Sequence, residues 1–530
     1  MERTDPALRH ELLFGERMVR CFTDRPADVW SMVADSADAS ANAPALLWGD
    51  DGCLGYSDLI TRADVLAQRL VAEGVRRGDR LATWLSNRPE YPVWFLACWR
   101  MGAVLVPMDT RLSTKEAAYL LSHSGAVMLL SEAAMVDKLP ASDELPDLRR
   151  VVLAEDLAAW MENGPRPVLP PHEADEEALA AILYTSGTTG APKGVMLAHV
   201  NIIHSVLHFE GSWGLPRGSR TLLAIPGCNV TGLITEFLTF FRLGGAVVLM
   251  PPFRAATFIE EAARHRIDHA FMVPAQYKLC LMNDALAAHD LSSWKLGSFG
   301  GAPMPAAFIA ELRERLPALS LSNGYGATET ASPVALLPAA LTPDYPDAVG
   351  APVPCADVIV VDEDGREVPR GMPGELWVAG PMVARGYWNN PDATRASFVG
   401  GYWRSGDVVT LGADGLIRLH DRKKDVVNRG GYKIYSAEVE AALAEHPAVA
   451  EVAVVGRPDP VLGERAHAFV CLKPGKTCDA EALASFARER LSDYKCPEGW
   501  TIGTDPLPRN SNGKLLKREL RDTLIERAEA

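Results

Sequence analysis

The sequence predicts an α/β protein, with a large N-terminal domain of parallel α/β sheets plus a small β-barrel subdomain, followed by a small mobile α+β C-terminal domain. A chain of 530 residues is too long for one hydrophobic core, so at least two domains are expected. Strand-like apolar runs alternate with amphipathic helical patterns, which is typical of parallel sheets covered by helices. From about residue 345 the pattern changes to short strands with Gly turns, which indicates a separate subdomain.

The alternation is clearest between residues 80 and 130. Strands are predicted at Arg80–Trp84, Ala103–Pro107 and Ala126–Leu130, and helices at Val93–Arg100 and Thr114–His123. Each strand is a short apolar run, and each helix connects two such runs. This order predicts parallel strands joined by helices that cover the sheet.

The same pattern recurs further along the chain, where strands at Gly244–Met250 and His269–Val273 flank a helix at Ala256–His265. Between about Ala348 and Asp421, short strands separated by Gly turns predict the β-barrel-like subdomain.

The last portion of the chain is predicted to form a compact α+β unit. Helices are predicted at Ala437–His446 and Ala480–Leu491, and strands at Val449–Val455 and Ala466–Leu472.

The bulk properties exclude several classes of protein. A net charge of −15 argues against a nucleic-acid-binding protein, because no basic surplus exists to neutralise phosphates. The nine cysteines are odd in number and scattered, so neither a disulfide framework nor a zinc site is expected, and a reducing cytoplasm fits best. The N-terminus lacks a secretory signal pattern, and the apolar stretches around Tyr91–Met108 and Phe237–Met250 are too short for an integral membrane segment.

Residues 183–194 (LYTSGTTGAPKG) have the composition of a phosphate-binding loop. They overlap the end of a buried strand predicted at Ala181–Tyr184. The glycines allow the backbone to turn, so that amide N–H groups and hydroxyls converge on anionic oxygens, and Lys193 adds a positive charge. The loop is not a Walker A motif, because Gly194 stands where that motif needs Ser or Thr. Taken alone, the segment could equally be a solvated Gly/Thr loop.

Further motifs follow this loop in a fixed order. They are Asn323–Glu329 (NGYGATE), Tyr402–Asp407 (YWRSGD), Asp421–Asp425 (DRKKD), Arg429–Ile434 (RGGYKI) and Pro508–Lys514 (PRNSNGK). Together with the loop at 183–194 they closely resemble the motifs of the adenylate-forming superfamily, which includes acyl-CoA synthetases, carrier-protein adenylation domains and luciferases. The resemblance covers nearly the whole chain.

This resemblance implies a domain organisation and an activity. The N-terminal domain would span residues 1–423, with two α/β subdomains and the β-barrel subdomain from about residue 345, and the C-terminal domain would span 424–530. The hinge would be Lys424, two residues beyond Arg422. The activity would be that of an ATP-dependent, magnesium-requiring carboxylic acid:CoA ligase that works through an acyl-adenylate.

The resemblance also implies roles for individual residues. In adenylation, Lys193 and its loop would hold the β- and γ-phosphates, and Glu329 would be the magnesium ligand. Thr328 would contact the α-phosphate or the substrate carboxylate, and Lys514 would bridge these two groups. The nucleotide-binding residues would be Thr185, Ser186, Gly187, Thr188, Thr189, Gly190, Lys193, Gly301, Ala302, Pro303, Asn323, Gly324, Tyr325, Gly326, Thr328, Asp407 and Arg422. Of these, Tyr325 would stack on adenine, and Asp407 and Arg422 would bind the ribose.

A second set of residues would bind the acid and coenzyme A. It comprises Asn229, Val230, Gly232, Gly300, Gly430, Gly431 and Tyr432. Rotation about Lys424 would exchange the face carrying Lys514 for the face carrying Arg429–Tyr432, past which the pantetheine arm enters.

The sequence departs from the family pattern at Pro226–Gly232, which reads PGCNVTG. Relatives usually show Pro-Leu-Phe-His followed two residues later by Gly, so Cys228 and Asn229 replace the aromatic residue and the histidine. Asparagine can donate a hydrogen bond but cannot carry the charge of an imidazolium. The adenylation step is therefore the one in which this chain is expected to differ.

The acid pocket is predicted to be lined by Phe209–Trp213, Cys228–Leu233 and Ser298–Met304. These segments are largely apolar, which favours a hydrophobic aliphatic, alicyclic or aromatic acid. Three alternatives stay open: an enzyme that loads a separate carrier protein, a ligase specialised for thioesterifying a preformed acyl-adenylate, and a nucleotide-binding protein without catalysis. A homodimer is also compatible with the sequence, which does not determine the oligomeric state, the acid or the pathway.

Overall fold

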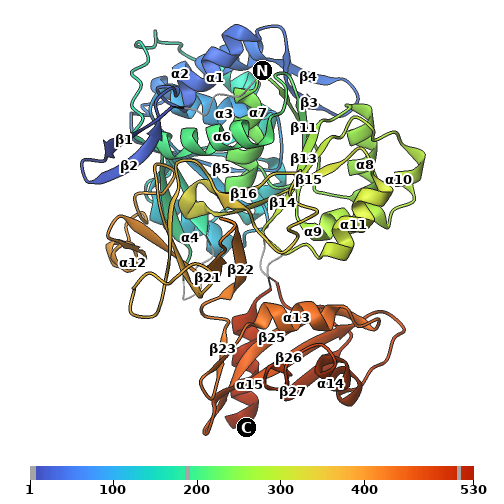
Figure 1. Cartoon of the computed structure of the whole chain (residues 1–530). Coiled ribbons are helices and arrows are strands. Elements are labelled where there is room, and N and C mark those ends of the chain that lie inside the picture. The colour runs from blue at the N-terminus through green and yellow to red at the C-terminus, as the bar shows by residue number, and fades with distance from the viewer. Residues whose placement is uncertain (1–6, 186–190, 510–514, 530) are drawn as a thin grey trace. The chain divides into compact units, whose positions relative to one another are not determined.

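The computed structural model describes residues 7–185, 191–509 and 515–529. Two compact units make up the chain (Figure 1). The first comprises Met1–Val358, Val378–Arg404 and Gly415–Ile417, and the second comprises Ile359–Trp377, Ser405–Asp414 and Arg418–Ala530. The hinge at Lys424 and the domain boundary there stay predictions.

A six-stranded sheet lies in the first unit. Its strands, in sheet order, are β10 (Lys193–Ala198), β9 (Leu179–Thr185), β6 (Val104–Met108), β5 (Arg80–Trp84), β7 (Ala126–Ser131) and β8 (Arg150–Leu153). Apart from the antiparallel pair β9 and β10, neighbouring strands run parallel. The predicted parallel strands between residues 80 and 130 are therefore confirmed.

Both faces of this sheet are buried. On β5 and β6, Leu81 and Leu105 belong to one hydrophobic cluster, whereas their neighbours Ala82 and Val106 belong to another. Successive side chains of a strand point to opposite faces, so helices must cover both sides, as in other parallel sheets. This is why the strands read as continuous apolar runs in the sequence.

A nine-stranded sheet forms the rest of the first unit's framework. Its strands, in sheet order, are β17 (Ala351–Pro352), β16 (Ser332–Leu337), β15 (Ser320–Ala327), β14 (Leu296–Gly300), β13 (His269–Met272), β11 (Arg220–Leu223), β12 (Ala246–Leu249), β3 (Pro44–Trp48) and β4 (Gly52–Gly55). The strands from β15 to β3 are parallel, and β16, β17 and β4 are antiparallel additions at the two ends. Since Leu223 of β11 shares a cluster with Leu81 of β5, one core lies between the two sheets.

Helices surround these sheets (Figure 1). The α-helices of the first unit are α1 (Val29–Ala39), α2 (Tyr56–Ala72), α3 (Glu90–Arg100), α4 (Thr114–Ser124), α5 (Leu157–Glu162), α6 (His199–Trp213), α7 (Thr239–Arg242), α8 (Ala255–Arg264), α9 (Pro274–Leu281), α10 (Ala285–Ala288), α11 (Ala306–Arg315) and α12 (Pro391–Ser397). A hairpin of β1 (Leu8–Leu13) and β2 (Arg17–Phe22) precedes them, and single-turn helices lie at η1 (Ala133–Lys138), η2 (Ser142–Glu144), η3 (Ala154–Asp156) and η5 (Thr328–Thr330).

The segment η4 (Thr231–Leu238) is a π-helix, a rare form that is often found at functional sites. It begins within the Pro226–Gly232 segment. A Cβ atom on Gly232 would collide with the carbonyl oxygen of Pro226, so only glycine allows this loop to pack against the start of the helix.

The short strands predicted after Ala348 are present. They are β18 (Asp357–Val361), β19 (Pro373–Ala379), β20 (Phe398–Val399), β21 (Tyr402–Leu411) and β22 (Ile417–Arg422), and their sheet order is β18-β19-β21-β20, with β22 beside β21.

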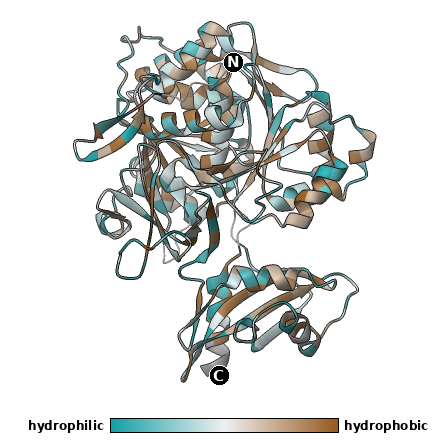
Figure 2. Ribbon diagram, viewed as in Figure 1, coloured by the Kyte–Doolittle hydropathy of each residue, from teal (hydrophilic) through white to brown (hydrophobic). Residues whose placement is uncertain are grey.

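The sheet of the second unit is buried on both faces. It contains β24 (Tyr432–Ile434), β23 (Val427–Arg429), β26 (Gly463–Leu472), β25 (Val449–Asp459) and β27 (Gly499–Gly503), and the helices of this unit are α13 (Ser436–Ala444), α14 (Ala480–Arg488), η6 (Asp493–Lys495) and α15 (Lys517–Glu529). Along β25, Val454 packs toward α13 and α14, whereas Val455 packs toward Leu520 of α15. Figure 2 accordingly shows long stretches of β25 and β26 toward the hydrophobic end of the scale. The predicted α+β character of this portion is confirmed.

No helix among the described residues combines the length and the apolar composition that a membrane crossing requires.

Candidate active site

The predicted phosphate loop begins and ends on paired strands. Thr185, the last residue of β9, is the register partner of Lys193, the first residue of β10. The loop therefore starts and finishes at one edge of the six-stranded sheet. Ser186, Gly187, Thr188, Thr189 and Gly190 lie outside the described residues, so their predicted roles stay predictions.

Lys193 and Glu329 meet at one tyrosine, although they are far apart in the sequence. The Lys193 ammonium lies 4.9 Å from the ring centroid of Tyr387. The Tyr387 hydroxyl donates a hydrogen bond of 2.9 Å to Oε1 of Glu329. Tyr387 was not predicted from the sequence, although its position in the Arg385–Trp388 run, between two strand-like segments, could have drawn attention to it.

The turn that carries Glu329 is unusually tight. Thr328 and Glu329 lie in the single-turn helix η5, and the next two residues, Ala331 and Ser332, have φ angles of 49° and 102°. Non-glycine residues rarely adopt such angles, so surrounding contacts must hold them. At Gly326 a Cβ atom would collide with the Ser332 carbonyl oxygen, so glycine is required where β16 folds back on β15.

The residues predicted to contact adenosine lie at the carboxyl ends of two adjacent parallel strands. Gly300 of β14 is the register partner of Gly324 of β15, and Tyr325 follows directly. Gly301, with a φ angle of 75°, turns the chain outward, and it is exposed together with Ala302 and Pro303. Ligands of open α/β sheets bind at this edge, beyond the carboxyl ends of the strands.

Asn323 has a structural contact of its own. Its side-chain amide donates to the Ala348 carbonyl oxygen at 3.1 Å, and the residue is buried. The side chain therefore ties β15 to the segment before β17, and a nucleotide contact of Asn323 stays a prediction.

Asn229 lies just before the π-helix, and its carbonyl oxygen accepts from the Leu233 N–H at 2.8 Å. The loop before it is held by Asn87, whose side chain accepts from the Gly227 N–H at 2.8 Å and donates to the Ile225 carbonyl at 3.0 Å. Asn87 was missed in the sequence, where a single asparagine after a strand carries no signal. Asn229 and Val230 are half-buried, so neighbouring residues partly enclose their side chains.

Two of the segments predicted to line the acid pocket are linked by a buried polar cluster. The Trp213 ring lies 4.3 Å from the His269 ring, and Nε2 of His269 contacts the Ser298 hydroxyl at 2.9 Å. On the other side, Nδ1 of His269 contacts the Thr221 hydroxyl at 3.0 Å, and this hydroxyl donates to Glu236 of the π-helix. The predicted apolar pocket region therefore contains a polar centre that the sequence analysis missed.

Burial controls the charge of this cluster. Glu236 and His269 are both fully buried. Burial raises the pKa of Glu236 to about 8 and lowers the pKa of His269 to about 3. Both groups are therefore uncharged near neutral pH, which avoids the cost of an ionised carboxylate in a hydrophobic core. A lone glutamate inside the apolar run 231–241 is the signal that could have revealed the cluster.

In the second unit the structure brings together the two residues predicted to bind ribose. Nε of Arg422 lies 3.3 Å from Oδ1 of Asp407, and Asp407 is buried. The Asp407 N–H donates to the Ser405 hydroxyl at 3.0 Å, which fixes the backbone beside the carboxylate. A carboxylate that accepts from two ribose hydroxyls would need such a fixed position.

The predicted hinge residue follows a firmly held segment. Oδ2 of Asp421 accepts from the Ser436 hydroxyl at 2.7 Å, and Nζ of Lys423 contacts Glu375 at 2.9 Å. Lys424 itself is exposed, and its carbonyl oxygen accepts from Arg521 at 3.3 Å.

Gly430 and Gly431 form the two-residue turn between β23 and β24. Their φ angles of 57° and 91° are both positive, as a tight hairpin turn of this kind requires. The hairpin therefore accounts for both glycines without a ligand. Tyr432 is 59% exposed, and its ring lies 4.8 Å from the Tyr494 ring, so an aromatic surface flanks the turn. Lys514 lies outside the described residues.

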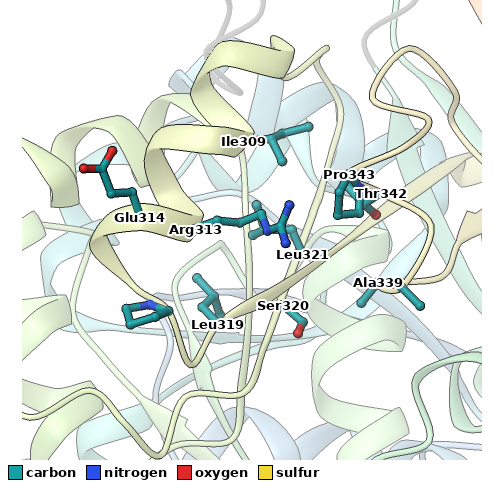
Figure 3. Close-up of a pocket in the computed structure, with 11 residues that line it drawn as sticks. Ile309, Arg313, Glu314, Leu319, Ser320, Leu321, Ala339, Thr342 and Pro343 are labelled. Carbon is teal, nitrogen blue, oxygen red and sulfur yellow. The ribbon is translucent and has the colours of Figure 1, made fainter.

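A separate pocket of about 540 Å³ lies beside α11 and the beginning of β15 (Figure 3). Arg313, Glu314, Ser320 and Thr342 are among its lining residues. This is the amino end of β15, opposite the end that carries Tyr325, and the lining contains none of the predicted site residues.

Comparison with known proteins shows which family the chain resembles along its length. The family model for AMP-binding enzymes matches residues 33–388, and the model for the C-terminal domain of AMP-binding enzymes matches residues 438–514. A feruloyl-CoA synthase from Amycolatopsis sp. is 36% identical over 92% of this chain and 96% of its own length. A fatty acid–[acyl-carrier-protein] ligase, ScoC, from Streptomyces coeruleorubidus is 35% identical over 92% of this chain and 94% of its own.

Solved structures of CoA synthetases are also similar to this chain. The o-succinylbenzoate CoA synthetase MenE from Bacillus subtilis, in complex with an acyl-adenylate intermediate, is 29% identical and superimposes with a TM-score of 0.84. The alignment covers 93% of this chain and 98% of that one. The same synthetase has also been solved with ATP and a magnesium ion.

The raised pKa of Glu236 predicts a pH-dependent loss of stability. Between pH 4.5 and 8 the carboxyl ionises in the unfolded chain but stays protonated in the fold, so the free energy of unfolding falls by up to about 1.4 kcal/mol per pH unit. Glu236→Gln should remove this slope. Thermal unfolding at pH 5 to 8 should therefore show a melting-temperature gain of the variant that grows with pH. A pH-independent difference would mean that Glu236 is ionised in the folded protein.

Proposed function

The chain belongs to the AMP-binding enzyme family, and from this premise we propose that it joins a hydrophobic carboxylic acid to coenzyme A through an acyl-adenylate. It is an AMP-forming acid–thiol ligase that uses ATP, Mg²⁺ and CoA. The observation that carries the proposal is the convergence of Lys193 and Glu329 on Tyr387, beside the edge at which the phosphate loop begins and ends. A cation and a carboxylate brought together in this way suit an ATP phosphate chain with its metal ion.

The residues present fit a magnesium ion bound together with ATP. Glu329 offers hard oxygen ligands and is half-buried, and its Oε1 is oriented by the Tyr387 hydroxyl. The described residues contain no group of three or more Asp, Glu, His or Cys that could hold a metal ion. Mg²⁺ is commonly bound by one or two carboxylates, waters and substrate phosphates, so a single carboxylate suffices. When bound, the ion would neutralise charge on the phosphate oxygens.

The remaining nucleotide contacts follow from the positions of the matched residues. The exposed edge Gly301–Pro303 and the Tyr325 ring would receive adenine, and Thr328 would contact the α-phosphate or the acid carboxylate. The Asp407–Arg422 pair would bind the ribose, with the carboxylate accepting from its hydroxyls.

Asn229, Val230, Gly232 and Gly300 would surround the acid. Aromatic rings of Phe209 and Trp213, 4.7 Å apart, and the buried start of the π-helix support a hydrophobic substrate. The relatives act on feruloyl and fatty-acyl groups according to their names, which span the aromatic and aliphatic acids proposed here.

The second half-reaction would use another face of the C-terminal domain. Lys514 would assist adenylation, and rotation about Lys424 would then bring Gly430, Gly431 and Tyr432 to the pantetheine arm. Lys423 is held by Glu375, which also precedes the proposed pivot, and the next residue, Lys424, is exposed, which supports a pivot there. The proposed C-terminal domain is then residues 424–530.

Coenzyme A is the proposed acceptor, and a carrier protein is the second candidate because the ScoC ligase uses one according to its name. Pyrophosphate exchange with a panel of acids, followed by comparison of CoA with a phosphopantetheinylated carrier, tests both. We place the reaction in the cytoplasm, since all nine cysteines, which lie within the described ranges, are unpaired. A homodimer remains a proposal.

Replacing Lys514 should separate the two half-reactions. Lys514→Ala removes a charge that acts in the adenylation transition state, so pyrophosphate exchange should slow by about two to three orders of magnitude. Thioester formation from a supplied acyl-adenylate should survive, as quenched-flow assays of each step would record. Equal impairment of both steps would contradict the two-face proposal.

Restoring histidine at position 229 should change the acid profile. Asn229→His places an imidazole, which can carry a positive charge, beside the developing negative charge and narrows the pocket, so small flat acids should be adenylated about 10-fold faster and bulky acids should bind less well. Pyrophosphate exchange across acids of graded bulk measures both effects. Identical profiles in the two proteins would show that Asn229 has no part in acid selection.

A further inference from the structure

A strap at Ala384–Trp388 joins the two sides of the proposed phosphate site. On one side it pairs with β10, where the Met196 N–H donates to the Gly386 carbonyl at 3.0 Å and the Trp388 N–H donates to the Gly194 carbonyl at 2.7 Å. On the other side, the Ala384 N–H donates to the Glu329 carbonyl at 2.8 Å. The strap thus touches both the strand that begins with Lys193 and the turn that carries Glu329.

Tyr387 makes the corresponding contacts with its side chain. The residue is 5% exposed, its hydroxyl donates to Oε1 of Glu329 at 2.9 Å, and the Lys193 ammonium lies 4.9 Å from its ring centroid. The phenolic hydroxyl is the donor of the pair with Glu329, because an ionised carboxylate can only accept.

We propose that Tyr387 is a positioning residue of the adenylation reaction, which orients the Glu329 carboxylate through its hydroxyl and the Lys193 ammonium through its ring. The inference rests on the roles proposed above for these two residues. The hydrogen bond to Oε1 fixes the orientation of the carboxylate, whose oxygens are ligands that a cation prefers. The ring holds the ammonium by a cation–π contact, which does not consume its N–H donors.

The strap is itself firmly held, so Tyr387 can define the geometry of its partners. Arg17 of β2 donates to the carbonyl oxygens of Ala384 at 2.8 Å and Arg385 at 3.1 Å. The Tyr387 N–H donates to the Thr394 hydroxyl at 2.9 Å, and the Phe398 ring packs on the tyrosine ring with centroids 5.7 Å apart. A ring fixed by backbone and side-chain contacts can orient a carboxylate before the nucleotide arrives.

Two variants separate the hydroxyl from the ring. Tyr387→Phe keeps the ring beneath Lys193 but removes the hydrogen bond to Glu329, whereas Tyr387→Leu removes both. Calorimetric titration with ATP, in Mg²⁺ and in EDTA, measures their effects on binding without turnover. Tyr387→Phe should weaken ATP binding about 5- to 10-fold in Mg²⁺ and leave binding in EDTA unchanged. Tyr387→Leu should weaken binding in both conditions, by a further 2- to 5-fold or so.

A double variant and a matched control make the test decisive. In a Glu329→Gln background, Tyr387→Phe should have no further effect on Mg²⁺-dependent ATP binding, because the carboxylate that the hydroxyl orients is gone. Tyr56→Phe is the control, since that buried hydroxyl donates to the Gly245 carbonyl away from the site. It should lower the melting temperature without altering the Mg²⁺ dependence of ATP binding.

The outcomes distinguish this inference from the proposed function. If Glu329→Gln weakens Mg²⁺-dependent binding but Tyr387→Phe does not, the positioning role is wrong and the role of Glu329 stands. If Tyr387→Phe weakens binding equally in Mg²⁺ and EDTA and lowers the melting temperature as Tyr56→Phe does, Tyr387 is only structural. If Glu329→Gln itself has no effect, the metal role of Glu329 fails, and the inference fails with it.

Discussion

The close approach of two backbone segments at Gly326 and Ser332 is the constraint on which the site of the first unit depends. There is no room between them for even one additional carbon atom. Because β16 returns so tightly along β15, Glu329 is held in a single turn next to the carboxyl end of the parallel sheet. The cost is two consecutive non-glycine residues with positive φ angles, a form of strain that is concentrated at functional sites.

The strap Ala384–Trp388 extends this constraint to the phosphate loop. It lies far along the chain from both of its partners, yet it hydrogen-bonds to β10 and to the Glu329 turn. The strand that begins with Lys193 and the turn that carries Glu329, the proposed metal ligand, are therefore connected by backbone contacts of the strap. Such preorganisation lets charged groups stabilise a transition state without first having to reorganise.

In the polar cluster around Glu236 and His269, burial determines the protonation state of the side chains. A carboxyl group and an imidazole in the core would be destabilising if both were ionised, and here burial keeps both neutral. The cluster lies between an aromatic ring of α6 and strands of the nine-stranded sheet, where the sequence suggests only apolar lining. The region predicted to bind the acid is thus less uniformly apolar than its composition indicates.

Local sequence patterns determined the α/β alternation, the short strands after residue 348 and the α+β character of the last portion, because periodicity of apolar residues follows directly from the geometry of helices and strands. Motifs that resemble those of the family led to the prediction of Lys193, Glu329, Asp407 and Arg422 as site residues, a prediction that rests on local sequence alone. Only the tertiary structure revealed the contacts of Tyr387. Its partners lie on β10 and η5, and no local pattern encodes a contact between segments that are distant in the chain.

The same reason explains why Asn87 and the Glu236–His269 cluster were missed and why Gly430 and Gly431 were assigned to ligand binding alone. Asn87 acts across a gap of 140 residues, and Glu236 meets His269 only when β11, β13 and the π-helix are packed together. The two glycines are needed by the β23–β24 turn, a requirement that becomes visible once their φ angles are known. The sequence specifies which chemical group each side chain carries. The contacts that orient these groups or keep them uncharged depend on how the chain folds.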